Sequence, residues 1–296
     1  MASPHPASRR ADDSPTAMPR AILEIAVDNL RDADLARHAG ADRLELARDL
    51  RRHGFTPDPR LVREVVAATG LPILAMARPG DGTDDRGPRA VTALLKDAER
   101  MLESGADGVV FGSITHGGEV DRQVTDGVVR LARGRATVFH RAFDLAPDPR
   151  DAVELLIDLG VTRILTSGHA RNEAEAMFRG ADDHAIPSPP AASTLDQRLA
   201  RIRFIVEIAR GRIEVLPCGG VRSHNADRFL LDTPARQLHS ACRAPASPSL
   251  DPDEAARLRT AMDRASDAQH VRRGLGTVGS PACAQQAPHP PPRETP

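Results

Sequence analysis

Acidic residues and histidines occur inside or at the end of several short apolar runs of this sequence. Two glutamates lie within such runs, Glu24 in ILEIAV and Glu45 in RLEL, and the motif FHRAFD at residues 139–144 ends a third. Carboxylates and imidazoles are the side chains that most often exchange protons with a substrate near neutral pH. The candidate catalytic residues of these motifs are Glu24, Glu45, His140 and Asp144.

Successive side chains of a strand point to opposite faces, which predicts the side on which these groups lie. In ILEIAV the alternate aliphatic residues form one continuous apolar face, so Glu24 should point to the other face. The same alternation turns Glu45 inward, and it turns His140 and His239 toward the same interior. Arg141 falls on the face opposite to His140 and reaches the same pocket only if the strand end twists.

Arginines, glycines and hydroxyl residues follow other apolar runs. Arg78 ends one run and is held by the following proline, so it is the expected partner of a glutamate or of an anionic ligand. The turn Gly219-Gly220 follows another run, where many α/β barrels hold phosphate with backbone N–H groups, although a tight turn alone also requires glycine. The predicted ligand-binding residues are Arg78, Arg141, Ser167, Gly168, Gly219, Gly220, His239 and Ser240.

The acidic residues also have a structural interpretation. Either Glu24 or Glu45 alone could be an ion-pair partner inside the protein, since two buried carboxylates on neighbouring strands need cations or a metal ion to offset them. Glu214 and Arg163 fall near the amino ends of their runs, and we predict that both are structural. The catalytic candidates lie instead at the carboxyl ends, where α/β barrels have their active sites, which favours a ligand site.

Eight short aliphatic or β-branched runs alternate with segments of helical spacing. The predicted strands are Ala21–Val27, Arg43–Leu46, Pro72–Ala77, Gly108–Phe111, Thr137–His140, Arg163–Thr166, Ile213–Pro217 and Gln237–His239. The predicted helices are Leu30–Ala39, Pro59–Ala68, Ala90–Ser104, Val124–Ala132, Asp151–Leu159, Leu195–Ala209, Ala226–Leu231 and Asp253–Ala268. Such repeated units imply parallel strands joined by right-handed crossovers.

Eight strand–helix units favour a closed barrel over an open doubly wound sheet, because closure leaves no edge strand unpaired. No G-x-G-x-x-G follows the first strand, so a dinucleotide is not an expected ligand. We predict an α/β protein with a single (β/α)₈ TIM-like barrel over residues 20–270. Residues 1–19 and the proline-rich residues 271–296 are predicted to be disordered tails, and His184–Ser193 a surface loop.

The composition argues against several classes of partner. The formal net charge is -1 and the sequence contains no Tyr and no Trp, so neither nucleic acid nor a membrane surface is an expected partner. The three cysteines show no C-x-x-C spacing, which argues against a disulfide framework or a zinc ribbon. Since the sequence has no apolar run of about 20 residues and no secretory signal, we predict a cytoplasmic protein.

The motifs taken together resemble one protein family. LEIAVDN, GADRLEL, GFTPD, ARPG, GVVFGSIT, FHRAFD, ILTSG, CGGVR and LHSA occur in the order, and at nearly the spacing, found in the CutC family, over about residues 21–268. The resemblance implies a cytoplasmic TIM barrel, which in this family often forms a homo-oligomer. It also implies a role in copper homeostasis and in binding copper ions.

Two positions depart from the family pattern where copper is concerned. Relatives often carry cysteines at the positions of Ala26 and Ala47, and such thiolates would be soft ligands for copper(I). Cys218 and Cys242 follow neighbouring strands and could replace those thiolates near His239. The resemblance therefore implies copper(I) as the candidate cofactor. The predicted metal ligands are His140, His239, Cys218 and Cys242.

The residues also support a different function, a TIM-barrel enzyme of the lyase or isomerase type that acts on a small anionic or phosphorylated metabolite. Arg78 and the Gly219-Gly220 turn would hold the anion, while Glu45 or Glu24 and His140 exchange protons as general base and acid. A noncatalytic barrel that binds a partner protein is the third alternative. Such a barrel would gain stability from Val or Leu at these polar positions, which argues against it.

Overall fold

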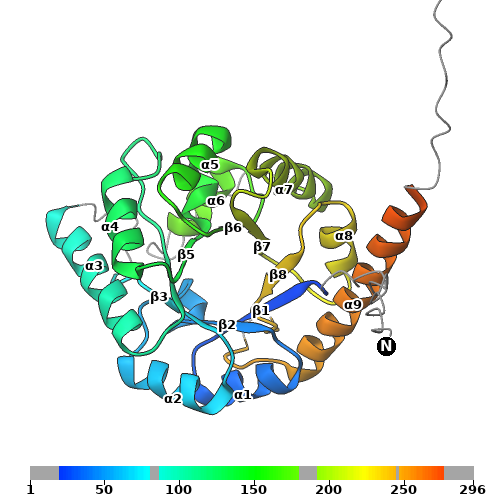
Figure 1. Ribbon diagram of the computed structural model, residues 1–296, viewed down its shortest axis with the longest axis horizontal. Helices are drawn as coiled ribbons and strands as arrows, with labels where there is room; N and C mark the ends of the chain where they lie inside the picture. The colour runs from blue at the N-terminus through cyan, green and yellow to red at the C-terminus, as the bar shows by residue number, and fades with distance from the viewer. Residues whose placement is uncertain (1–19, 81–86, 180–191, 245–246, 277–296) are drawn as a thin grey trace, which may run out of the picture.

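The computed structural model describes residues 20–80, 87–179, 192–244 and 247–276, which form a ring of strands surrounded by helices (Figure 1). The strands are β1 (Ile22–Val27), β2 (Arg43–Leu46), β3 (Ile73–Met76), β4 (Gly108–Phe111), β5 (Ala136–Phe139), β6 (Arg163–Thr166), β7 (Glu214–Pro217) and β8 (Gln237–Ser240). The α-helices are α1 (Leu30–His38), α2 (Pro59–Thr69), α3 (Pro88–Glu103), α4 (Arg122–Ala132), α5 (Pro149–Asp158), α6 (Arg171–Arg179), α7 (Leu195–Ala209), α8 (Ala226–Leu231) and α9 (Pro252–Gly276). Two 3₁₀ helices, η1 (Leu50–Arg52) and η2 (Arg141–Leu145), follow β2 and β5.

The sheet confirms the predicted (β/α)₈ TIM-like barrel. Parallel ladders join the strands in the order β7-β6-β5-β4-β3-β2-β1-β8. β7 and β8 lie side by side and complete the ring (Figure 1), although no backbone ladder joins these two strands, all of whose residues the structure describes. Each predicted strand agrees with the observed one within a residue at either end.

Aspartates at the ends of loops start several of the outer helices. Asp58, Asp121 and Asp148 are the N-cap residues of α2, α4 and α5. Each aspartate side chain accepts a hydrogen bond from a backbone N–H of the first helical turn, a group that has no partner within the helix. These caps fix where each crossover helix begins after the mouth of the barrel.

Apolar residues form two layers, one on each side of the barrel wall. A small inner cluster contains Ala47, Leu74, Met76, Val110, Val138, Leu165, Leu216 and Cys218. The larger outer layer joins the strands to the helices and includes Leu23, Ile25 and Leu44. The predicted alternation is therefore confirmed for β1 and β2: the aliphatic residues face the helices, and Glu24 and Glu45 lie buried in the interior.

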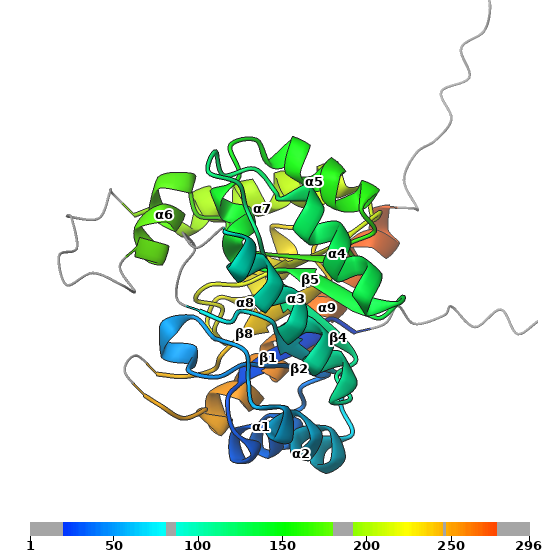
Figure 2. The same ribbon diagram turned by 90° about the vertical axis from the view of Figure 1, so that its left-hand side faces the viewer.

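Two helical segments differ from the sequence prediction. α6 was not predicted, because it is a second helix between β6 and β7, and Figure 2 shows it set apart from the ring of helices around the strands. α9 continues to Gly276, past its predicted end at Ala268. The predicted tail 1–19, residues 277–296 of the other tail and most of the predicted loop His184–Ser193 lie outside the described residues.

None of the described helices is both long enough and apolar enough to cross a membrane.

Candidate functional site

A cavity of about 220 Å³ lies at the carboxyl ends of the barrel strands, the face at which TIM barrels have their active sites. Residues predicted from the sequence form much of its wall: Glu45, Arg78, His140, Arg141, Cys218, Gly219, Gly220, His239 and Ser240. The other lining residues are Ala26, Leu50, His53, Met76, Leu165, Arg222 and Ala241. The barrel thus brings most of the predicted site residues together.

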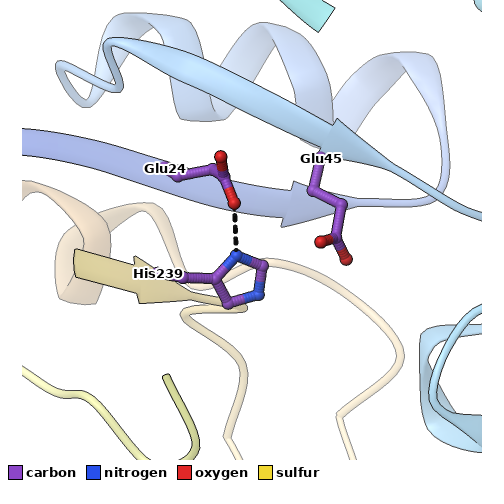
Figure 3. Close-up of side chains that lie close together, drawn as sticks. All are labelled: Glu24, Glu45 and His239. Carbon is purple, nitrogen blue, oxygen red and sulfur yellow. Dashed lines mark hydrogen bonds and ion pairs between the residues drawn. The ribbon is translucent and has the colours of Figure 1, made fainter. Parts of the chain in front are cut away.

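Glu24 on β1 lies at the centre of a buried row of polar side chains. The strand register places Arg43 of β2 on one side of Glu24 and His239 of β8 on the other. Glu24 Oε1 accepts a hydrogen bond from His239 Nδ1 at 2.7 Å (Figure 3), and Glu24 Oε2 accepts one from Arg43 Nε. Arg43 also donates to Gln237 Oε1 at 2.7 Å. The cation beside Glu24 is therefore Arg43, whereas Arg78, the expected partner of a glutamate or of an anionic ligand, lines the cavity.

The charges of Glu24 and His239 stabilise each other. Burial alone would raise the pKa of Glu24, but the Arg43 guanidinium and the hydrogen bond from His239 hold that pKa well below its usual range. Burial alone would lower the pKa of His239, but the carboxylates of Glu45 and Glu24 outweigh it and raise that pKa. Glu24 is thus a permanent anion that fixes the His239 ring with its proton on Nδ1. The other ring nitrogen lies on the side of Glu45 (Figure 3).

Glu45 is the inward-facing residue of β2 that follows Arg43, and it pairs with Ala26 in the ladder between β1 and β2. Its side chain is buried, and Oε2 has no hydrogen-bond partner among the described residues. Burial raises the pKa of Glu45 to about 7; the charge of Glu24 acts in the same direction, and that of His239 opposes it. A carboxyl group with this pKa is present in both protonation states near neutral pH, as a general acid or base requires.

His140 lies at the end of β5 and is the N-cap of η2. Its Nδ1 accepts a hydrogen bond from the backbone N–H of Ala142 at 3.1 Å, which leaves the ring proton on Nε2. Burial lowers the pKa of His140 to about 3, and the charges of Arg78 and Arg141 add to that effect. Gly112 makes room for the ring, since a Cβ at that position would overlap His140 Cε1 and Nδ1. His140 is therefore a neutral hydrogen-bond donor.

Two arginines that the sequence selected also line the cavity. Arg141 lines the cavity beside His140, although strand alternation predicted that it faces the helices. The prediction was wrong because the chain leaves β5 at Phe139 and continues as η2, where the alternation of a strand no longer applies. Arg78 lies 4.8 Å from the ring centroid of Phe55 and donates to the carbonyl oxygens of Arg52 and Gly54. These contacts hold the Arg78 guanidinium at the cavity wall.

The turn after β7 forms the opposite part of the wall. Gly219 and Gly220 have φ values of 75° and 80°, in the left-handed region that favours glycine. Arg222, which was not selected from the sequence, lines the cavity and donates to Ser240 Oγ at 3.2 Å. The signal for Arg222 was present in the motif CGGVR, where an arginine follows the glycine turn by two residues.

Asp144, Ser167 and Gly168 are not among the residues that line this cavity. The Asp144 carboxylate accepts hydrogen bonds from Thr166 Oγ1, from Ser167 Oγ and, at 2.9 Å, from the Ser167 backbone N–H. Gly168 packs against α7, where a Cβ would approach the carbonyl oxygen of Arg198 to 2.6 Å. The three residues connect η2 to the end of β6, and their contacts support the loops around the cavity.

The motifs of the sequence resemble those of the CutC family, and the model of this family tests the resemblance. The model of the CutC family matches residues 21–182, which is more than half of the chain. The chain belongs to the CutC family. It is 35% identical over 219 residues to a family protein CutC of Treponema denticola, an alignment that covers 74% of this chain and 80% of that protein.

Further relatives carry the same family name. The chain is 32% identical over 223 residues to the copper homeostasis protein cutC homolog of Homo sapiens, covering 75% of this chain and 74% of the human protein. A solved CutC structure from Streptococcus agalactiae superposes with a TM-score of 0.64 at 26% identity, over 75% of this chain and 98% of that chain. The resemblance predicted from the sequence is therefore confirmed.

The two cysteines proposed to replace the usual CutC thiols lie in different layers. Cys218 belongs to the inner cluster and lines the cavity, whereas Cys242 is buried in the outer layer between the barrel and its helices. The chain turns at Cys242, which has a φ of 46°, and this turn follows β8. Burial raises the pKa of the Cys218 thiol and raises that of Cys242 to about 11, so both thiols are protonated near neutral pH.

The group of metal ligands that comes together at the cavity does not fit the copper(I) that the family resemblance implies, although Met76 and Cys218, which carry sulfur, also line the cavity. Among the described residues, one group of three candidate metal ligands comes together, and its donor atoms lie within 4.8 Å of one another: Glu24, Glu45 and His239. Carboxylate and imidazole donors suit divalent ions, whereas copper(I) prefers thiolate and thioether sulfur. Ala26 and Ala47, the positions at which the family resemblance implies thiolates, carry only methyl groups. Glu45 Oε2 is buried and has no hydrogen-bond partner in the described part of the chain, so this oxygen is open to a divalent ion.

Proposed function

We propose that this CutC-family barrel binds a small anionic metabolite in the cavity at its mouth and exchanges a proton with it. One observation carries the proposal: Glu45 is a buried carboxyl group at the cavity wall, with a pKa raised to about 7 and one oxygen that has no hydrogen-bond partner among the described residues. Burial that costs stability and tunes a carboxyl group to neutral pH is a feature of acid–base sites.

The charges around the cavity support an anionic ligand. Arg78, Arg141 and Arg222 line the wall, and the carboxylate of Glu24 is already neutralised by Arg43 beneath it. The cavity, at about 220 Å³, is smaller than the roughly 300–1,000 Å³ typical of pockets for drug-sized molecules. The favoured ligand is therefore a metabolite of few carbon atoms with at least one negative charge.

Each polar group has a distinct role in this proposal. Glu45 removes or returns a proton at the reacting atom of the ligand. His239, oriented by Glu24, stabilises the charged form of Glu45. His140, which is neutral, donates its Nε2 hydrogen to an oxygen that gains negative charge in the transition state. This arrangement is compatible with a lyase or an isomerase that removes a proton beside a carbonyl group.

Proton exchange with the solvent tests this proposal even when the overall reaction has not been identified. Small carboxylated and phosphorylated metabolites are incubated with the protein in heavy water, and deuterium entering carbon–hydrogen bonds is measured by mass spectrometry. The proposal expects exchange that Glu45→Gln abolishes and His140→Asn strongly reduces, with Glu64→Gln on the exposed side of α2 as the control. Exchange that survives both cavity substitutions would overturn the proposal.

The names of the relatives favour a second candidate, a role in copper homeostasis. The observation that supports it is the group of Glu24, Glu45 and His239, whose oxygen and nitrogen donors suit copper(II) better than copper(I). Competition titrations with chelators of each copper ion test this candidate. It expects copper(II) binding that Glu45→Gln with His239→Gln removes and that Cys218→Ser with Cys242→Ser leaves intact. No specific binding of either ion would eliminate it.

We also propose that the protein acts in the cytosol. Cys218 and Cys242 are free thiols in the structure, and reduced cysteines are usual in that compartment. Fractionation of the native cells tests this location, and recovery of the protein mainly with membranes or with the culture medium would contradict it.

A further inference from the structure

β7 and β8 are neighbours in the ring, but in the described structure no backbone ladder joins them. Side chains make the hydrogen bonds at this junction instead. Gln237 Nε2 donates to the carbonyl oxygen of Val215 at 3.3 Å near the amino ends, and Ser240 Oγ donates to that of Val221 at 2.8 Å near the mouth. Backbone groups beyond the ends of these strands are therefore available for other partners.

Gly219 and Gly220, in the turn after β7, both line the cavity. Within the described ranges, neither of their N–H groups has a hydrogen-bond acceptor, although both residues line the cavity. Gly219 has no room for a side chain, because a Cβ there would lie 2.8 Å from Ser167 Cβ. At Gly220 the nearest atom to a Cβ is Arg198 Nη1 at 4.0 Å, so the positive φ, and not a lack of space, explains the glycine. Successive N–H groups in such turns commonly bind anions.

Arg222 supplies a fixed positive charge beside this turn. Its guanidinium donates to three neutral acceptors: the carbonyl oxygens of Val221 and Arg243, each at 2.8 Å, and Ser240 Oγ at 3.2 Å. In the part of the chain that the structure describes, no carboxylate pairs with Arg222. The guanidinium is thus held rigidly at the cavity wall with its charge not neutralised by the protein.

We propose that Gly219, Gly220 and Arg222 form a subsite for the phosphate group of a small phosphate monoester. This subsite rests on the proposed function, because it names the anionic group of the same ligand. A phosphate dianion has three terminal oxygens, and it accepts hydrogen bonds from two backbone N–H groups and a guanidinium more fully than a carboxylate does. Glu45 and His140 line the same cavity, so the carbon atoms next to the phosphate ester lie within their reach.

Isothermal titration with two matched probes tests the subsite. Glycerol 3-phosphate and glycerate have similar carbon chains but differ in the anionic group. We expect the wild-type protein to bind glycerol 3-phosphate more tightly than glycerate. Arg222→Gln should lower the affinity for glycerol 3-phosphate about tenfold or more. Arg78→Gln, which alters the opposite wall of the same cavity, should lower this affinity less.

Equal affinity for the two probes, absence of binding, or a larger effect of Arg78→Gln than of Arg222→Gln would overturn the subsite. Since Arg222 also holds loops together, thermal unfolding is measured for each variant. If Arg222→Gln unfolds, Arg222→Lys replaces it, and this variant is expected to weaken phosphate binding because it keeps the charge but loses the planar guanidinium. The deuterium exchange that depends on Glu45 separately reports whether the proposed function itself fails.

Discussion

Glu24 and His239 are 215 residues apart in the sequence, yet they are direct neighbours on β1 and β8, where His239 Nδ1 donates to Glu24 Oε1 at 2.7 Å. The contact crosses the point at which the first and last strands of the barrel meet. It joins the charged row inside the barrel, which includes Arg43, to the histidine at the cavity wall. The orientation of the site therefore depends on a carboxylate that lies between the paired first and last strands of the barrel.

Glu24→Gln should destabilise the protein by about 3–5 kcal/mol, because it leaves the buried guanidinium of Arg43 without its counter-ion. Urea unfolding measures this change. The control is Asp126→Asn, which breaks the exposed ion pair with Arg130 on α4 and should cost less than about 1 kcal/mol. Equal effects of the two substitutions would contradict the structural role given to Glu24.

Glu45 should make the stability of the protein depend on pH. Its pKa is about 7 in the folded protein and close to 4.5 in the unfolded chain, so between these values the folded state retains a proton that the unfolded state has lost. The stabilisation from this proton is complete below about pH 4.5 and is lost as the pH rises through about 7. Urea unfolding of wild type and Glu45→Gln at several pH values measures the difference. We expect the wild type to lose about 3 kcal/mol of stability relative to the variant across this range. Equal pH dependence of the two proteins would contradict the raised pKa.

Removing the charge of Glu45 should also lower the pKa of His239. The Glu45 carboxylate is the largest of the influences that raise the pKa of His239 against the effect of burial. In Glu45→Gln that pKa should therefore fall. A titration of the His239 ring signals by NMR, in wild type and in Glu45→Gln, measures this change. An unchanged pKa of His239 in Glu45→Gln would show that the charge of Glu45 does not act on the His239 ring.

Gly112→Ala should displace the ring of His140, because the added Cβ overlaps two atoms of that ring. We expect loss of the hydrogen bond from Ala142 N–H to His140 Nδ1, and a decrease in deuterium exchange of about 100-fold from the misplaced ring. The nitrogen shifts of the His140 ring report the hydrogen bond directly. The control is Gly80→Ala, where a Cβ meets no atom within 4 Å. Unaltered His140 signals in Gly112→Ala would contradict this packing.

Strand periodicity predicted much of the site because the barrel repeats one simple rule. Glu24, Glu45 and His239 were assigned to the interior by alternation alone, and the observed register agrees. Strand alternation predicts the face on which a residue lies. It does not predict which of several inward-facing cations lies within hydrogen-bonding distance of Glu24. For that reason Arg43 was not recognised as the partner of Glu24, although its position on the inner face was available from the sequence.

Residues beyond the strand ends were harder to predict. Arg141 enters the cavity because the chain changes from strand to 3₁₀ helix at that point, and Cys242 lies in the outer layer after a turn with positive φ. Both positions depend on local backbone geometry that the hydrophobic pattern does not encode. α6 was also missed, because it is a second helix between β6 and β7, where the repeating strand–helix unit predicts only one.

The central claim is that the cavity binds a small anionic metabolite through its arginines and Glu45. Native mass spectrometry of the protein purified from its own cells tests it most directly, because the method detects both retained metabolites and retained metal. The account predicts a bound small anion on the wild-type protein that is reduced or absent on Arg78→Gln and Arg222→Gln. A wild-type protein that carries copper and no small molecule would contradict it.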